Sequence, residues 1–375
     1  MLPDLSPTRA EVDLGAIRHN ARVLARLAAP ASVLAVVKAD AYGHGAIPVA
    51  RALAEEGVKR FAVATVGEGA TLREAGIETP ILVFAAPLPH ALAAYVRLGL
   101  SVTVSSREVA EHVTEAARTH GPLTAHVKVD TGMRRLGVRP EETAEVLRLL
   151  HDAPGVSAEA LWTHLATADG DLGFARDQLR TFETLLGDLG SLRPPLHHVA
   201  NGPMLLRMPE DAAREGTLVR AGGVLYGLSS SRMLAPHLAA ADLRPAMRLV
   251  TRVVHLQTVR AGETISYGRT WTAPEDRRIA TLPVGYADGL PRALSNRGRV
   301  GIGGRLLPIA GRVCMDMLLA DLGPPDGPAA SVRLGDEAVL FGPGGPDALD
   351  QAEAGETITY ELTCALAARV GRAWR

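Results

Sequence analysis

Eight short apolar runs rich in β-branched residues recur through the first 240 residues and alternate with segments of helical spacing. The runs span residues 33–38, 61–66, 81–86, 102–106, 125–130, 158–164, 196–201 and 218–227. Between them lie amphipathic segments such as 46–57 and 107–119. Eight strand-and-helix repeats predict a (β/α)8 barrel of the TIM type. The alternative is an open doubly wound sheet, which is disfavoured because no Gly-x-Gly-x-x-Gly turn follows the first run.

The pattern changes after about residue 242. Alternating runs punctuated by Gly, Pro and Asn replace the helical segments, at residues 248–259, 277–287 and 299–322. Only residues 361–371 have helical spacing there. We therefore predict a barrel over residues 1–241 and a mostly β domain over residues 242–375. Residues 9–14 have the pattern of a strand, so we expect residues 1–13 to pair with the second domain.

Composition excludes several classes of protein. The 375 residues carry a net charge of −1 and no long basic run, which argues against a nucleic-acid-binding surface. No apolar stretch reaches about 18 residues, so we expect no membrane span. The first residues have no basic or apolar signal region, and two cysteines cannot form a disulfide framework. These features predict a cytoplasmic protein, and we expect no metal site.

Chemically useful side chains gather where the predicted strands end, which is the catalytic face of such barrels. They are Lys38, Lys128, His164, Asn201 and Arg220. Lysine is rare in this chain, with only three among 40 basic residues. Lys38 directly follows five apolar residues, and desolvation lowers the pKa of a lysine amine toward the neutral form that a Schiff base needs. The alternative is an ordinary solvated lysine at a strand end.

The residues around Lys38, AVVKADAYGHG (35–45), resemble the cofactor-lysine motif of the alanine racemases, which are barrel-type pyridoxal-phosphate enzymes. Eight further blocks resemble this family in the same order, so that the resemblance covers nearly the whole chain. They are KVDTGMRRLG (128–137), WTHLATAD (162–169), HVAN (198–201), VRAGGVLYG (219–227), ISYGRTW (265–271), VGYADG (284–289), GRVCMDM (311–317) and TITYELTC (357–364).

The resemblance implies two catalytic bases. Lys38 is expected to carry pyridoxal 5'-phosphate covalently and to exchange a proton on one face of the substrate. Tyr267 is expected to act on the opposite face, and in this family it comes from the second subunit of a homodimer with shared active sites. His164 lies beside that tyrosine in the family, and Arg220 and His198 complete the network.

The resemblance also implies a cofactor site. Arg220 is expected to hydrogen-bond the pyridine nitrogen; because guanidinium remains protonated, it can donate but not accept a proton there. Backbone N–H groups of Gly222 and Gly223 are expected to hold the phosphate, together with the phenols of Tyr42 and Tyr360. The remaining implied cofactor-binding residues are His164, His198, Asn201 and Gly202. Gly202 departs from the family's usual serine, from which we expect weaker cofactor binding or compensation elsewhere.

For the substrate, Arg135 is expected to bind the carboxylate, with help from the backbone N–H of Met315 in the other subunit. Lys128 is often carbamylated in the family, and the added carboxylate would hold Arg135 in place. The alternative is a bound anion near Arg135. Tyr286 and Asp316 are expected to line the entrance.

The function implied by the resemblance is interconversion of L-alanine and D-alanine, supplying D-alanine for peptidoglycan. One alternative is a pyridoxal-phosphate racemase for serine or a broader set of amino acids, which the large side chain of Tyr360 disfavours. A barrel-type decarboxylase is disfavoured because Arg220 stands where that relative has an acid. A non-catalytic pyridoxal-phosphate-binding protein is a further alternative, which would not need Tyr267.

Overall fold

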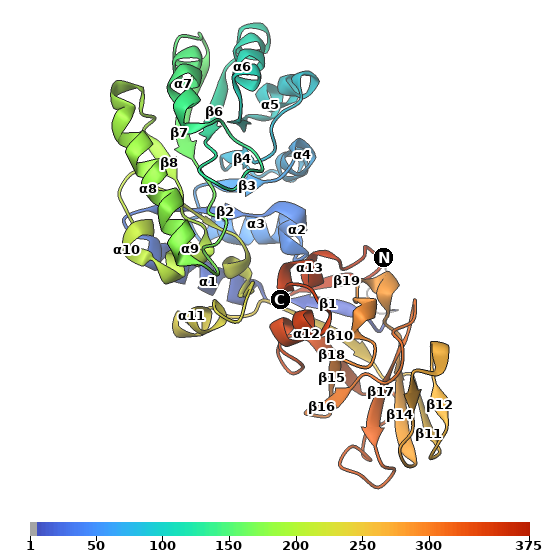
Figure 1. Cartoon of the computed structure of the whole chain (residues 1–375). Coiled ribbons are helices and arrows are strands. Elements are labelled where there is room, and N and C mark those ends of the chain that lie inside the picture. Colours follow the sequence, from blue (N-terminus) through green and yellow to red (C-terminus); the bar gives the residue numbers. More distant parts are fainter. Residues whose placement is uncertain (1–5) are drawn as a thin grey trace.

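The first part of the chain forms a nearly closed barrel of eight parallel strands in the computed structural model, which describes residues 6–375 (Figure 1). The strands neighbour one another in the order β8-β7-β6-β5-β4-β3-β2-β9, and isolated bridges join the two edges. They are β2 (Ser32–Val36), β3 (Phe61–Val63), β4 (Ile81–Val83), β5 (Leu100–Val104), β6 (Leu123–Lys128), β7 (Val156–Trp162), β8 (Leu196–His198) and β9 (Leu218–Ala221). The predicted (β/α)8 barrel is confirmed, and the doubly wound alternative is wrong.

Amphipathic helices cover the outside of this barrel (Figure 1). In α1, for example, Ile17 and Leu24 are buried, and Asp13 caps the first turn by accepting from the N–H of Ala16. The helices are α1 (Leu14–Ala28), α3 (Ala46–Glu55), α4 (Val66–Glu74), α5 (Leu92–Leu98), α6 (Arg107–His120), α7 (Thr143–His151), α8 (Leu172–Asp188), α9 (Gly202–Arg207), α10 (Pro209–Ala212) and α11 (Ala235–Ala240).

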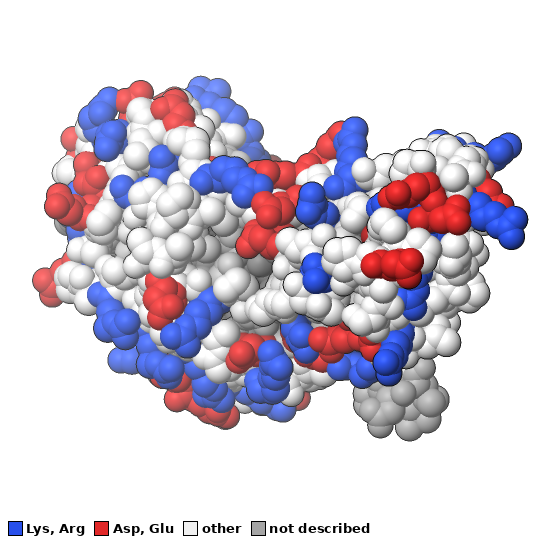
Figure 2. Space-filling model, turned by 90° about the horizontal axis from the view of Figure 1, so that it is seen from below, with Lys and Arg blue, Asp and Glu red and all other residues white. Residues whose placement is uncertain are grey.

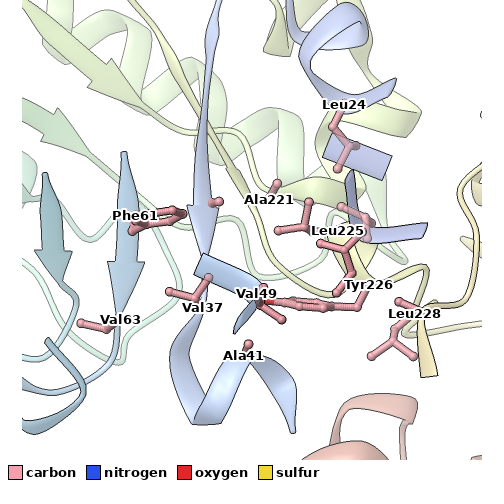
Figure 3. Packing of buried hydrophobic residues seen from close by; sticks show 14 of the residues in the cluster. Leu24, Val37, Ala41, Val49, Phe61, Val63, Ala221, Leu225, Tyr226 and Leu228 are labelled. Carbon is pink, nitrogen blue, oxygen red and sulfur yellow. The ribbon is translucent and has the colours of Figure 1, made fainter. Parts of the chain in front are cut away.

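The main apolar core of the barrel lies between the strands and these helices. Figure 3 shows Val37, Val49 and Tyr226 gathered around the end of β2. Tyr226 is fully buried, and its hydroxyl donates to the carbonyl of Val36 at 2.9 Å. This packing fixes the strand end that carries Lys38.

The interior of the barrel has an apolar and a polar side. The apolar side is a separate cluster formed by Leu34, Val36, Ala62, Leu82 and Leu218. The polar side holds the buried side chains of His126, Lys128, His198 and Arg220. Buried polar groups are costly unless they are hydrogen-bonded, so the polar side requires an organised network.

The second part of the chain is mostly β. Its largest sheet has the order β16-β15-β18-β10-β1-β19, and a three-stranded sheet (β11-β14-β17) and a two-stranded one (β12-β13) complete it. The strands are β10 (Met247–Arg252), β11 (His255–Val259), β12 (Thr264–Ile265), β13 (Trp271–Thr272), β14 (Arg277–Leu282), β15 (Arg299–Ile302), β16 (Arg305–Pro308), β17 (Leu318–Gly323), β18 (Glu337–Phe341) and β19 (Gly371–Trp374).

Strands from both ends of the described chain, β1 and β19, lie in the six-stranded sheet of the second domain. β1 (Arg9–Val12) pairs antiparallel with β10 and parallel with β19 before the chain enters the barrel. Residues 1–5 of the segment for which we expected such pairing lie outside the described residues. The division of the chain at residues 241 and 242 stays a prediction.

Three local expectations are wrong. The predicted helix over 361–371 is shorter and shifted, since α13 spans Thr359–Cys364 and β19 begins at Gly371. A further helix, α12 (Ala348–Ala354), was not predicted from the sequence because it is short and follows a glycine-rich loop. Asp347 caps its first turn. The predicted strand over 218–227 also ends early, because the glycines after Ala221 lead into a buried 3-10 turn, Gly223–Tyr226.

Figure 2 shows Lys and Arg mixed with Asp and Glu over one face, and uncharged residues lining a hollow between the two lobes of the molecule. Within residues 6–375, none of the helices combines the length and the apolar character that crossing a bilayer demands.

Candidate active site

A left-handed turn follows Lys38 at the mouth of the barrel. The short element α2 (Lys38–Tyr42) begins at Lys38 and ends at Tyr42. The four residues after Lys38 have φ between 52° and 54°. L-residues rarely adopt this conformation, which costs roughly 1–2 kcal/mol per residue. The turn redirects the chain so that Lys38 and Tyr42 both belong to the mouth. Sequence analysis did not foresee it.

Three contacts hold this turn in place. Glu68 of α4 accepts from the N–H of Ala39 at 2.7 Å, and Asp40 accepts from the N–H of Ala46 at 2.7 Å. The turn ends at Gly43, where a Cβ would lie 2.1 Å from the carbonyl oxygen of Thr363. The strained segment is therefore fixed by the barrel and by the second domain together. Glu68 is a site residue that sequence analysis missed.

Lys38 lies near the cation Arg135 and the carboxylate of Glu68. Burial and the charge of Arg135 lower the pKa of Lys38, while Glu68 acts in the opposite direction. The lowered pKa enlarges the neutral fraction of the amine, which is the form that attacks a carbonyl. Arg135 is on an exposed loop shaped by Asp130, whose carboxylate accepts from the N–H groups of Gly132 and Arg134.

Lys128 is buried deeper in the barrel. Burial, followed by the charges of Arg220 and Arg135, lowers the pKa of Lys128 to about 8. Its Nζ lies 4.6 Å from the centre of the Trp162 ring and has no hydrogen-bond partner within residues 6–375. Trp162, which sequence analysis did not single out, also stacks on the ring of His198. The unpartnered amine is free for a further group.

Arg220 is 3% exposed and is held by uncharged partners. Its Nη1 donates to the carbonyl of His198 at 2.6 Å and lies 3.1 Å from that ring's Nδ1. Its Nη2 donates to the carbonyls of Thr163 and Val199 and lies 3.2 Å from Nδ1 of His164. Burial lowers the pKa of Arg220 to about 9, so the side chain stays a cation at neutral pH.

Both histidines beside Arg220 are neutral. Burial, and after it the charge of Arg220, places the pKa of His164 and of His198 well below 6.5. The charges of Lys128, Arg135 and Lys38 act on His164 in the same direction. Four cations thus surround one imidazole, and the positive potential of this mouth suits an anionic ligand.

Gly222 and Gly223 form a close-packed backbone segment against two tyrosines, which we call the glycine cradle. A Cβ on Gly222 would be 2.6 Å from the Tyr42 hydroxyl oxygen, and a Cβ on Gly223 would be 2.6 Å from that of Tyr360. The two tyrosine rings meet edge to face with centroids 5.5 Å apart. Burial raises the pKa of Tyr42 and raises that of Tyr360 to about 12, so both phenols keep their protons and can donate. Tyr360 reaches this place from α13 in the second domain.

Gly202 has a steric explanation. A Cβ at this position would lie 2.4 Å from Cγ2 of Val224, so a serine would need Val224 to move. Asn201 caps α9 by accepting from the N–H of Met204 at 2.9 Å. Its side-chain oxygen thus positions the turn beside the cradle. Weaker cofactor binding caused by Gly202 stays a prediction.

The remaining predicted residues are exposed in a single chain. Tyr267 is 72% exposed, Met315 52% and Tyr286 42%. Asp316 pairs with Arg369 of the same domain at 2.8 Å. Within residues 6–375, none of the four shares a hydrogen bond or ion pair with Lys38 or Arg220. They lie on the outside of the second domain.

Comparison with known families covers both parts of the chain. The sequence model of "Alanine racemase, N-terminal domain" matches residues 12–230, and that of "Alanine racemase, C-terminal domain" matches residues 246–374. The chain belongs to the alanine racemase family. Members of this family are isomerases, and the family resemblance found in the sequence is thereby confirmed.

Relatives within the alanine racemase family match over nearly their whole length. The chain is 44% identical to an alanine racemase of Cutibacterium acnes, covering 98% of each protein. It is 41% identical to one of Halothermothrix orenii, covering 98% of the chain and 97% of the relative. The structure of the alanine racemase from Streptomyces lavendulae, 36% identical, superimposes with a TM-score of 0.91 over 99% of this chain and 97% of that one.

Proposed function

We propose that the protein interconverts L-alanine and D-alanine in the cytoplasm with pyridoxal 5'-phosphate bound at Lys38. The observation that carries this proposal is the position of the Lys38 amine, with its lowered pKa, in a mouth lined by cations, two glycines and two protonated phenols. A small aldehyde that carries a phosphate fits such a set of groups. When bound, this cofactor supplies an electron sink that acidifies the Cα–H of an amino acid.

The cradle and Arg220 would bind the two ends of the cofactor. Backbone N–H groups of Gly222 and Gly223 and the phenols of Tyr42 and Tyr360 are donors for the phosphate. Arg220 has the pyridine nitrogen as its partner in this proposal. Since its guanidinium stays charged and its neighbours His164 and His198 are neutral, Arg220 donates a hydrogen bond without giving up its proton.

The proton at Cα is handled by two bases on opposite faces. Lys38 takes or returns it on one face, and Tyr267 from a second copy of the chain does so on the other. Racemisation needs both, because a proton removed and returned on the same face leaves the configuration unchanged. The exposure of Tyr267 and Met315 in one chain supports a homodimer in which the second domain of each copy completes the partner's site.

The substrate carboxylate would bind Arg135 and the backbone N–H of Met315 from the second copy, with Tyr286 and Asp316 at the entrance. We propose that Lys128 is carbamylated, because its buried amine has no partner within the described residues and the resulting carboxylate would hold Arg135. Tyr360, against the cradle, leaves room for a methyl side chain better than for a larger one. The D-alanine produced would supply peptidoglycan.

Incubation of the purified protein with pyridoxal 5'-phosphate and L-alanine in D₂O tests the proposal. We expect loss of optical activity together with deuterium at Cα, and much slower exchange with L-serine in a parallel sample. Retention of optical activity with no deuterium would contradict the proposed function. Faster exchange with L-serine than with L-alanine would contradict the assignment of alanine as the substrate.

A further inference from the structure

A line of hydrogen-bonded side chains crosses the barrel interior from Arg220 toward the opposite end of the strands. Nδ1 of His198 lies 3.1 Å from Nη1 of Arg220, and its Nε2 lies 3.1 Å from Nδ1 of His126. Nε2 of His126 lies 2.9 Å from Oε2 of Glu159. We call these four residues the barrel relay. Three of its members, His126, His198 and Arg220, are at most 3% exposed.

The relay ends in an ion pair near the amino ends of the strands. Arg60, which directly precedes β3, donates to both oxygens of Glu159 at 2.8 and 2.9 Å. Both side chains are about a quarter exposed, at 25% and 22%. Glu159 is therefore the single carboxylate of the relay, and it lies at the end farthest from the mouth.

Glu159 reaches the relay through an irregularity in β7. Between β6 and β7, Ala125 pairs with Ala158 while His126 pairs with Ala160, so Glu159 is an extra residue with no opposite partner. Such a bulge re-aims one side chain without changing the rest of the strand. In a regular strand, Glu159 would point to the face opposite that of Ala158 and Ala160.

The relay has one consistent direction. A carboxylate accepts only, so His126 donates from Nε2 to Glu159 and, being neutral, must accept at Nδ1. His198 therefore donates from Nε2 to His126, and its own Nδ1 is left as an acceptor. That acceptor faces Nη1 of Arg220, which can only donate. Every polar atom along the line is satisfied in this arrangement alone.

The electrostatics of the two ends agree with this direction. The hydrogen bond from His126 and those from Arg60 lower the pKa of Glu159 to about 2, so its carboxylate is charged. Burial lowers the pKa of His126 despite the neighbouring carboxylate, and burial lowers that of His198 further. The two imidazoles are neutral, and each has a single proton to place.

We propose that Glu159 is a positioning residue for racemisation: through His126 it fixes His198 in the tautomer that accepts from Arg220, and so holds that guanidinium toward the cofactor. This inference rests on the proposed role of Arg220. It assigns a function to a carboxylate at the far end of the barrel that touches neither the cofactor nor the substrate.

The first test needs no substitution. In the cofactor-loaded protein labelled with ¹⁵N-histidine, His198 should show an unprotonated Nδ1 and a protonated Nε2, and His126 should show the same tautomer. Assignment uses the spectra of the His126→Asn and His198→Asn variants. A protonated Nδ1 on His198 in the unsubstituted protein would overturn the proposal.

The second test compares two variants that remove the same ion pair. Glu159→Gln replaces the pure acceptor by an amide that can also donate, so the fixed tautomer of His198 should become a mixture. Arg60→Gln leaves the carboxylate in place, so the tautomer should be retained. If the ion pair had only a structural role, both variants would change the His198 signals alike, and that result would contradict the proposal.

Kinetics separate this inference from the proposed function. We expect Glu159→Gln to lower kcat roughly 10-fold, the worth of one misplaced charge-assisted hydrogen bond, with KM for alanine little changed and the absorbance of the bound cofactor shifted. Arg60→Gln should keep both the spectrum and kcat closer to those of the unsubstituted protein. A protein that binds cofactor but has no racemase activity would contradict the proposed function. An active protein whose kcat and His198 tautomer do not respond to Glu159→Gln would contradict only the relay.

Discussion

Burial lowers the pKa of both Lys38 and Arg220, but with different consequences for their charge. Burial and the charge of Arg135 lower the pKa of Lys38 toward a reactive neutral amine. Arg220 is buried more completely, yet at a pKa of about 9 it remains charged at neutral pH, held by carbonyls and neutral imidazoles. One residue is thus suited to exchange protons and the other to keep them.

The first prediction concerns the attachment of the cofactor. Borohydride reduction of the protein loaded with pyridoxal 5'-phosphate should place a stable tag on Lys38 alone, because Lys38 lies beside the cradle and Lys128 is enclosed in the barrel. Peptide mass spectrometry identifies the tagged lysine among the three in the chain. Lys38→Ala should take up no tag. A tag on Lys59 or Lys128 would refute the assignment.

The second prediction concerns pH. The charge of Arg135 disfavours the protonated form of Lys38, so Arg135→Gln should raise the pKa of Lys38. In the protein freed of cofactor, the midpoint of Lys38 arylation by an amine-specific reagent should then move to higher pH. Arg134→Gln, on the same loop, is the control and should move it less. An unchanged or lower midpoint in Arg135→Gln would be inconsistent with this role.

Sequence analysis could place residues at strand ends but could not find the relay. Lys38, His164 and Arg220 follow or lie within apolar runs, and parallel strands bring such ends to one face. Glu159 lies in the run AEALWTH with nothing to distinguish it from a solvent-facing residue of an alternating strand. Only the register between β6 and β7 reveals the extra residue and the direction of its side chain.

At the scale of elements, the strands were predictable because few folds other than a barrel accommodate β-branched runs separated by helical segments. The ends of the strands were not predictable, because contacts from distant elements decide how the chain turns beyond them. The turn after Lys38 is an example: Glu68, Ala46 and Thr363 hold it, and the local sequence shows only Gly43 and Gly45. Helix α12 was missed because it is short and follows a glycine-rich loop.

The left-handed turn leads to a stability prediction. Ala39 is exposed at φ 52°, where glycine avoids the clash of a Cβ. Ala39→Gly should therefore stabilise the protein by about 0.5 kcal/mol, since relief of strain exceeds the added entropy of the unfolded chain. Ala25→Gly, at an exposed position of helix α1, should destabilise it by about 1 kcal/mol. Unfolding in denaturant measures the free energy of unfolding of both variants. Equal losses of stability in the two would contradict the claim that the backbone at Ala39 is strained.

For the whole molecule, tight burial of histidine predicts sensitivity to acid. His44 is fully buried beside Tyr226, and burial lowers its pKa to about 4, although carbonyls of the left-handed turn accept from its ring. The unfolded chain binds the proton near pH ~6.5, so stability is complete above that pH and falls as the pH drops toward 4. At pH ~5 the loss from this one residue is about 2 kcal/mol.

Unfolding in denaturant at pH 7.5 and pH 5 checks this expectation. The difference in the free energy of unfolding between the two conditions should be smaller in His44→Phe by about 2 kcal/mol, while the aromatic packing on Tyr226 is kept. An equal pH dependence in the two proteins would show that His44 titrates normally in the folded state.

The central claim is that each active site joins Lys38 of one chain to Tyr267 of another, and mixing two inactive variants tests it directly. Lys38→Ala and Tyr267→Ala dimers, allowed to exchange subunits at random, should form mixed dimers with one intact site of two. Since half of the dimers are mixed, alanine racemisation should rise from near zero to roughly one quarter of the unsubstituted activity. If mixed dimers form and no activity returns, both bases belong to one chain and the shared site is contradicted.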